Sequence, residues 1–289
     1  MYKGRFKWLS SVDDTNINTL YILNSRMAKF YARLETRRMY DIMISPFEKE
    51  TTPDDITLSF LEWFKQNKFN NILEIGCGNG RIRKELPLNY NTKYTGTEVS
   101  PTTIKNNPIY WPDSRWVTES IYNLDFKEEK FDLVFSFYVL EHLVFPKLAL
   151  DKMYELLGEN GSLVIVCPDF SKTKRLPSQY LGFSYWQSAK IKLSKNLYFD
   201  ALVSLFDSKF RLKPKLTNLK NKAGKFLINA NPICLDLNDD DQIWPDCDAV
   251  YLVNKVELEH WAIQKKLTIN YPNGQEGLFS EHIFLVLSK

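Results

Sequence analysis

Three glycines and one glutamate have the types and spacing needed to hold a nucleoside. Gly76, Gly78 and Gly80 follow a short apolar run, and Glu98 ends the next apolar-polar run. A strand that breaks into a glycine-rich turn before a helix lets a ligand lie against bare backbone. A carboxylate at the tip of the following strand can accept hydrogen bonds from both hydroxyls of a ribose. The pattern therefore predicts a site for a nucleoside cofactor.

The spacing of the glycines indicates which nucleoside binds. The dinucleotide pattern G-x-G-x-x-G needs a glycine at position 81, where this chain has Arg81. From Glu74 to Gly80 the chain reads E-I-G-C-G-N-G instead. This stretch resembles the first motif of the class I methyltransferases, which use S-adenosyl-L-methionine. The resemblance implies that the cofactor contacts Glu74, Gly76, Cys77, Gly78 and Gly80.

Later segments resemble the same family in the same order between residues 70 and 169. Ser120 stands where the family usually has an Asp that receives the adenine amino group, and a hydroxyl can still accept one hydrogen bond there. The run V-L-E-H that ends at His142 resembles the fourth-strand motif of small-molecule methyltransferases. The further cofactor-binding residues implied by the resemblance are Glu98, Val99, Ser120, Ile121, Ser136 and Phe137.

The resemblance also implies the fold class, an α/β doubly wound, Rossmann-like sheet of seven strands. Most strands are expected to be parallel and the last one antiparallel. We divide the chain into four parts: an N-terminal helical extension (1–69), the S-adenosylmethionine-binding core (70–169), a basic and acidic lid insertion over the substrate site (170–250), and a final helix and strands (251–289). The fifth strand is expected at 161–169, after a helix that ends at Gly158.

Helix signals flank this core. Apolar residues recur every three or four positions from Ile17 to Leu34 and predict a long amphipathic helix. Its basic face is either solvated or, with Tyr31, Arg37 or Tyr40, helps to close the cofactor pocket. A second helix is expected after a cap at Thr52 and Pro53. A capping box at 254–257 predicts the last helix, to about residue 266.

The insertion has a basic half and an acidic half. From Lys172 to Lys225 there are eleven Lys, two Arg and two Asp, interleaved with aromatic residues, and six Asp then lie between Asp236 and Asp248. The two halves could neutralise each other. Clustered carboxylates also suit Mg²⁺ or Ca²⁺, but no recognisable calcium loop is present, so we expect no metal site. Helices within 184–210 are expected to have an apolar side made of Trp186, Ile191, Leu197, Ala201, Leu205 and Phe210.

Two residues are candidates for the proton transfer that methylation needs. Methyl transfer from a sulfonium is an in-line displacement, so the protein mainly positions the reactants and removes a proton from an oxygen or nitrogen nucleophile. His142 follows the fourth strand and is one candidate base, although it could equally pack its helix without meeting substrate. Asp169, at the mouth of the fifth strand, is the other candidate.

Composition excludes several classes of protein. With 289 residues, 44% of them apolar and 25% charged, the chain is typical of globular proteins. No apolar run reaches the roughly 18 residues of a membrane span, and the start lacks the apolar core of a signal peptide. The four cysteines show no C-x-x-C spacing, which argues against a zinc site and a disulfide framework. We expect a cytoplasmic protein.

Three functions remain open. The first is O-methylation of a small molecule or of the sugar of a glycan, either soluble or lipid-linked. A lipid-linked acceptor would suit the basic, aromatic insertion and would bring the protein into peripheral contact with an anionic membrane surface at its inner face. The second is RNA methylation, with the insertion stacking bases. A net charge of only +3 and the lack of a recognisable RNA-binding module make nucleic acid the less favoured partner. The third is a non-catalytic cofactor-binding module, against which the intact glycines and Glu98 argue. The sequence indicates no oligomeric state.

Overall fold

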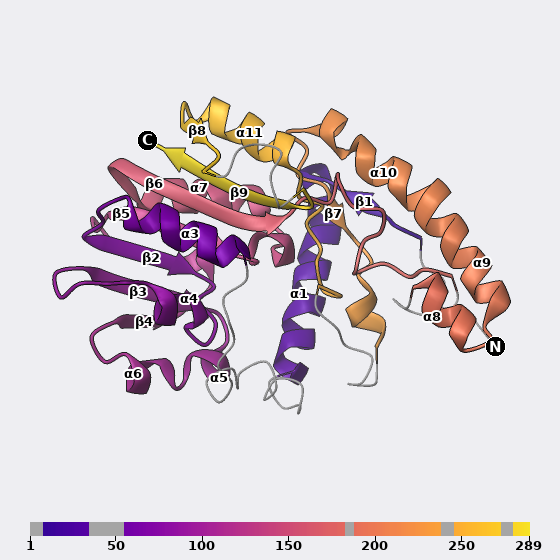
Figure 1. Cartoon of the computed structure of the whole chain (residues 1–289), viewed down its shortest axis with the longest axis horizontal. Helices are drawn as coiled ribbons and strands as arrows, with labels where there is room; N and C mark the ends of the chain where they lie inside the picture. Colours follow the sequence, from indigo (N-terminus) through magenta and orange to yellow (C-terminus); the bar gives the residue numbers. More distant parts are fainter. Residues whose placement is uncertain (1–7, 35–54, 183–187, 238–245, 273–279) are drawn as a thin grey trace. The chain divides into compact units, whose positions relative to one another are not determined.

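The computed structural model describes residues 8–34, 55–182, 188–237, 246–272 and 280–289, and the chain forms two compact units (Figure 1). The unit that we call the sheet unit comprises Glu35–Leu140, Pro146–Cys167 and Trp261–Lys289. The unit that we call the helical unit comprises Met1–Leu34, Glu141–Phe145 and Pro168–His260. The four-part division expected from the sequence is finer and stays a prediction.

The sheet unit is organised around seven strands in the order β4-β3-β2-β5-β6-β9-β8. Their bounds are β2 (Asn71–Ile75), β3 (Lys93–Glu98), β4 (Arg115–Thr118), β5 (Phe131–Phe137), β6 (Leu157–Pro168), β8 (Thr268–Asn270) and β9 (His282–Ser288). The pairings from β4 to β6 are parallel, whereas β8 and β9 are antiparallel to each other. The predicted Rossmann-like fold class is confirmed.

Helices cover both faces of this sheet, with α3 in front of the strands and α7 behind them in Figure 1. Helix α3 buries Phe60 against the rings of Phe135 and Phe137, at centroid distances of 5.2 and 4.8 Å. The helices of the unit are α3 (Asp55–Lys65), α4 (Arg81–Glu85), α5 (Pro101–Ile104), α6 (Asn107–Tyr110), η2 (Ile121–Asn123) and α7 (Pro146–Leu156). The cap expected at Thr52 and Pro53, like Arg37 and Tyr40, lies outside the described residues.

The start of β6 differs from the sequence-based expectation. Helix α7 ends at Leu156, and the strand begins at Leu157 rather than at residue 161, so Gly158 lies within the strand and caps no helix. Leu157 pairs with Phe131, both are buried, and the register of β5 and β6 shifts before Leu133. Burial of this apolar pair extends the strand across the glycine.

Helix α11 (Lys255–Gln264) begins as expected, because the side chain of Asn254 accepts a hydrogen bond from the backbone N–H of Glu257 at 3.1 Å. The helix ends two residues before the predicted boundary. Its first residues belong to the helical unit and its last residues to the sheet unit.

The helical unit contains the long helix predicted near the N-terminus. Helix α1 (Ile17–Leu34) buries Leu20, Leu23, Met27 and Phe30 along one side. The other elements are β1 (Ser11–Val12), η1 (Asp14–Asn16), η3 (Leu140–His142), α8 (Ala189–Ser194), α9 (Tyr198–Phe206), the π-helical turn η4 (Asp207–Leu212), α10 (Lys213–Thr217), η5 (Asn218–Lys222), β7 (Ile228–Asn229) and η6 (Ile233–Asp236). Among the described helices, none combines the length and apolarity needed to span a bilayer.

Candidate cofactor site and a histidine–carboxylate cluster

The turn between β2 and α4 has one glycine whose open side can receive a ligand. Gly76, Gly78 and Gly80 all have positive φ, at 69°, 53° and 79°. A Cβ atom added to Gly76 would lie 2.4 Å from Val139, and one added to Gly80 would lie 2.5 Å from the ring of Trp111. At Gly78 the nearest atom would be 3.9 Å away, so this position is open. Gly76 and Gly80 therefore let the turn pack against Val139 and Trp111, whereas Gly78 leaves its backbone accessible to a ligand.

Glu98 lies at the carboxyl end of β3, beside this open glycine. Its Oε2 accepts a hydrogen bond from the backbone N–H of Gly78 at 3.1 Å, and its Oε1 accepts one from Ser100 at 3.0 Å. The side chain of Asn107 donates to the carbonyl oxygen of Gly78 at 3.0 Å. Both peptide groups of Gly78 are thus held in place. Sequence reasoning missed Asn107, because no spacing rule links it to the turn.

Two residues assigned to the cofactor by resemblance have buried side chains. Glu74 accepts a hydrogen bond from the hydroxyl of Tyr94, and burial raises the pKa of its carboxyl to about 8. Cys77 is buried as well, and burial raises the pKa of its thiol. Neither side chain is exposed to a ligand in this conformation, and their cofactor contacts stay predictions.

The residues expected around the adenine and ribose lie at the ends of β3, β4 and β5. Val99 is exposed and Ile121 is buried. The Oγ atom of Ser120 caps η2 by accepting a hydrogen bond from the N–H of Tyr122 at 3.4 Å. Ser136 is buried, and its hydroxyl has no hydrogen-bond partner within the described ranges. Phe137 is partly buried and packs against the core of the sheet unit.

The two candidate bases belong to the helical unit, where Asp169 directly follows β6 and His142 ends η3, the short helix after β5. Asp169 follows β6, and its Oδ1 accepts hydrogen bonds from the N–H and the hydroxyl of Ser171, at 3.0 and 2.6 Å. Burial raises the pKa of this carboxyl, while the Ser171 bonds oppose the rise.

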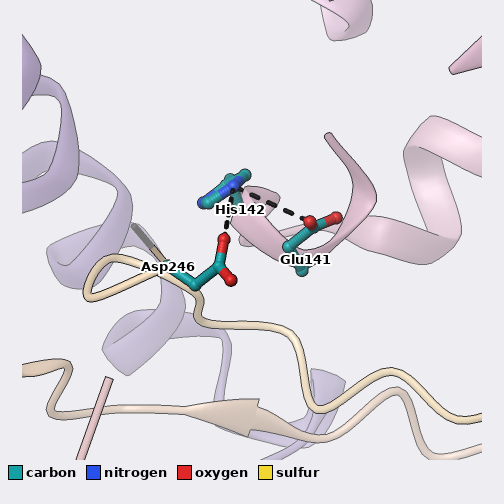
Figure 2. A group of neighbouring side chains, drawn as sticks. All are labelled: Glu141, His142 and Asp246. Atoms are coloured by element: carbon teal, nitrogen blue, oxygen red, sulfur yellow. Dashed lines mark ion pairs between the residues drawn. The ribbon is translucent and has the colours of Figure 1, made fainter. Parts of the chain in front are cut away.

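His142 lies among three carboxylates, two of which appear with it in Figure 2. Its Nδ1 is 3.2 Å from Oδ2 of Asp248, and its Nε2 is 3.9 Å from Oε1 of Glu141 and 4.0 Å from Oδ1 of Asp246. Burial lowers the pKa of His142, but Asp248 and the other two carboxylates outweigh this and raise it to about 10. The imidazolium favoured by these neighbours cannot accept a proton.

Helix α1 contributes to the same cluster. The hydroxyl of Tyr31 donates a hydrogen bond to Oδ2 of Asp248 at 2.5 Å. Burial and the Asp248 charge raise the pKa of the Tyr31 phenol. Burial raises the pKa of Asp248, but the His142 charge and the hydrogen bonds to Asp248 together outweigh this and lower it. We name the residues Tyr31, Glu141, His142, Asp246 and Asp248 the histidine–carboxylate cluster. In the sequence, Glu141 lies in the run V-L-E-H and the two aspartates lie in the acidic half of the insertion. No sequence pattern indicated that these carboxylates lie close together in the fold.

Comparisons with known proteins identify the type of domain. Residues 73–165 match the model of the methyltransferase domain family. An uncharacterized protein from Methanocaldococcus jannaschii is 31% identical over 127 residues, which are 44% of this chain and 53% of that protein. The chain thus spans about half the length of the curated relative that it matches.

Solved structures with low sequence identity resemble the chain. The N-methyltransferase NodS from Bradyrhizobium japonicum WM9, in complex with S-adenosyl-L-homocysteine, is 22% identical, with 47% of this chain and 75% of that chain covered and a TM-score of 0.39. An S-adenosylmethionine-dependent methyltransferase from Clostridium acetobutylicum ATCC 824 is 12% identical, with coverages of 82% and 92% and a TM-score of 0.49. The family match itself spans β2 to β5 and most of β6. Residues 73–165 of the sheet unit thus match a methyltransferase domain, and the strands around them have the Rossmann-like order.

Proposed function

We propose that the protein transfers a methyl group from S-adenosyl-L-methionine to an oxygen atom of a small molecule or of a glycan sugar. Where the acceptor is a glycan sugar, we propose that it is carried on a lipid. The observation that carries the transferase proposal is the pairing of the Glu98 carboxylate with the open backbone of Gly78. When bound, the cofactor supplies an electrophilic methyl group on a sulfonium, together with a good leaving group.

The residues present fit this cofactor. The two oxygens of the Glu98 carboxylate accept hydrogen bonds from the backbone of Gly78 and Ser100, which orient the carboxylate at the end of β3. A carboxylate at the end of the second strand of such a sheet suits the two hydroxyls of a ribose. Val99 and Ile121 offer apolar surface for the adenine ring, and the hydroxyl of Ser120 offers an acceptor for its amino group.

Asp169 is the better of the two candidate bases. The carboxylates around His142 keep its imidazole protonated, so His142 would have to leave its ion pairs before it accepted a proton. Asp169 has no such ion pair with an imidazole to break among the described residues, and burial raises the pKa of its carboxyl above the ordinary value, which favours proton acceptance by a general base.

The surface of α9 and η4 supports a lipid-linked acceptor. Phe199, Leu202 and Phe210 expose 68%, 64% and 70% of their surface, while Ala201 faces the interior of the helical unit. Ala201 therefore does not belong to the apolar side expected from the sequence, and Trp186 lies outside the described residues. Exposed lysines, including Lys195 and Lys209, accompany the apolar side chains. An apolar helix face accompanied by lysines is typical of helices that lie in an anionic membrane surface.

Calorimetry tests the cofactor proposal. S-adenosylmethionine and its product S-adenosylhomocysteine should each bind the full-length chain at one site, and NAD should bind much more weakly. Incubation with the labelled cofactor and an extract of membrane lipids should then transfer label to the lipid fraction. Tighter binding of NAD, or no binding of either sulfur compound, would overturn the proposal.

Vesicle co-sedimentation tests the acceptor class. The chain should sediment with vesicles of phosphatidylcholine and phosphatidylglycerol but less with phosphatidylcholine alone, and high salt should weaken the binding because it screens the lysines. Leu202→Ser should reduce sedimentation, whereas Ile109→Ser, at an exposed position of the sheet unit, should not. A shift of bulk tRNA in a gel without vesicle binding would instead favour an RNA acceptor, and binding to neither would point to a small soluble one.

A further inference from the structure

The histidine–carboxylate cluster contains a group of ligand atoms that methyl transfer does not use. The carbonyl oxygen of Glu141 accepts hydrogen bonds from the backbone of Val250 and Tyr251, at 2.8 and 2.9 Å. These bonds fasten the segment that contains Asp246 and Asp248 against η3. Residues far apart in the sequence thereby present their side chains to one point.

The two ring nitrogens of His142 have different surroundings. Nδ1 faces Asp248 at 3.2 Å. Nε2 is 3.9 Å from Glu141 and 4.0 Å from Asp246, and Figure 2 shows these two carboxylates beside the ring. Distances of 3.9 and 4.0 Å are too long for hydrogen bonds. Atoms that bind one metal ion at about 2.1 Å each lie roughly 3–4 Å from one another. One ligand atom from each of these three residues lies within 4.8 Å of the others.

Glu141 supplies a second, independent observation. Its side chain is 0% exposed, and neither carboxylate oxygen has a hydrogen-bond partner among the residues that the structure describes. A buried carboxylate without hydrogen bonds is costly, and metal coordination is one of the ways in which proteins compensate this cost. Three carboxylates around a single imidazole also leave excess negative charge at this point. The buried, unbonded carboxylate and the excess negative charge both favour a bound cation at this point.

We propose that Glu141, His142 and Asp246 bind a divalent transition-metal ion, Zn²⁺ or Mn²⁺, through one oxygen of each carboxylate and Nε2 of the imidazole, which releases its proton to solvent when the ion binds. An imidazole nitrogen beside two carboxylates suits these ions better than Mg²⁺ or Ca²⁺, which prefer oxygen ligands alone. The sequence predicts no metal site when the aspartates of the insertion and the cysteines are weighed as ligands but Glu141 and His142 are not.

Asp248 and Tyr31 form the outer shell of this site. Metal-binding histidines usually donate their other ring N–H to a carboxylate, which fixes the tautomer and the orientation of the ring. Asp248 stands at that position beside Nδ1, and Tyr31 holds Asp248 from α1. The side chains of His142 and Asp246 remain 24% and 37% exposed, which leaves a side of the site open for ion entry and for a water ligand.

Calorimetry with ZnCl₂ and with MnCl₂, on the full-length chain freed of metal by a chelator, tests the site. We expect one ion per chain, with Mg²⁺ binding more weakly. Asp248→Asn should weaken binding by roughly 10–100-fold, as loss of an outer-shell partner does, and Glu141→Gln and Asp246→Asn should weaken it more. Glu129→Gln, which removes an acid of the sheet unit, is the matched control and should bind as the unaltered chain does.

Two results would overturn the proposal. One is the absence of Zn²⁺ and Mn²⁺ binding at millimolar concentration. The other is equal binding by the unaltered chain and by Asp246→Asn, which would place the ion elsewhere. Circular dichroism checks that each variant folds, and Asp246, being partly exposed, keeps the test decisive if Glu141→Gln fails to fold. The Mn²⁺ paramagnetic resonance spectrum of the bound ion should change in Asp246→Asn.

Discussion

Oε2 of Glu98 and the backbone nitrogen of Gly78 lie 3.1 Å apart, so the tip of β3 is fastened to the glycine turn that follows β2. The sequence indicated these two features separately, one as a ribose acceptor and the other as a place of close backbone approach. Their hydrogen bond makes them one structural feature at the carboxyl edge of the parallel strands, which is where ligands of such sheets bind.

Replacement of Glu98 should weaken cofactor binding. Glu98→Ala removes two charge-assisted hydrogen bonds to the ribose, worth about 2–4 kcal/mol together, so the affinity for S-adenosylmethionine should fall by tenfold or much more. Glu98→Gln keeps an acceptor for Gly78 and should lose less. Calorimetry measures both, with Glu129→Ala as a control that should bind normally. An unchanged affinity of Glu98→Ala would contradict the assignment.

The glycines of the turn should differ in what they contribute. Gly78→Ala places a methyl group in open space at a φ of 53°, which costs roughly 1–2 kcal/mol in strain but obstructs the approach of the cofactor. Gly80→Ala clashes with Trp111 and should lower the melting temperature more. Thermal unfolding and calorimetry on both variants separate the effects. If Gly78→Ala bound cofactor normally, the open side of Gly78 would not be the binding surface.

The core of the fold could be predicted because its signals are local. A central parallel strand is buried on both faces, so β2 and β5 stand out as apolar runs, and Asn254 marks the start of α11 by its own capping bond. The extension of β6 past Gly158 could not be predicted in the same way, since it depends on the contact of Leu157 with Phe131 in a neighbouring strand.

The histidine–carboxylate cluster could not be predicted for a related reason. The period of apolar residues and the spacing of motifs predict which residues are neighbours within one helix or strand. Tyr31, His142 and Asp248 come from three segments that are far apart in the sequence, so neither pattern predicts their contact. The sequence predicts His142 as a candidate base, but the protonation state of its imidazole depends also on Asp246 and Asp248, more than one hundred residues away. Lys192 is a second case, because its amino group is buried against Leu181 and Ser204 although the surrounding sequence is typical of a solvated basic face.

Glu74 should make the stability of the protein depend on pH. Its pKa is raised from 4.5 to about 8 in the folded state, chiefly by burial, so between these values the folded chain keeps a proton that the unfolded chain loses. This contribution to stability is complete below pH 4.5 and disappears as pH rises through about 8, with a slope of at most about 1.4 kcal/mol per pH unit. Glu74→Gln should therefore lose less stability between pH 5 and pH 8 than the unaltered chain. Denaturant unfolding at both pH values measures this, and equal losses would contradict it.

Tyr31→Phe should destabilise the protein although it removes a single oxygen atom. The hydroxyl of Tyr31 donates to Asp248 at 2.5 Å, and its loss leaves a partly buried carboxylate with one bond fewer, at a cost of about 1–3 kcal/mol. Tyr21→Phe, on the same helix, is the matched control, because Tyr21 is exposed and contacts Phe145 through its ring. Denaturant unfolding should show a lower midpoint for Tyr31→Phe and an unchanged one for Tyr21→Phe. Equal midpoints for all three chains would mean that the hydrogen bond between α1 and Asp248 contributes nothing to the stability of the helical unit.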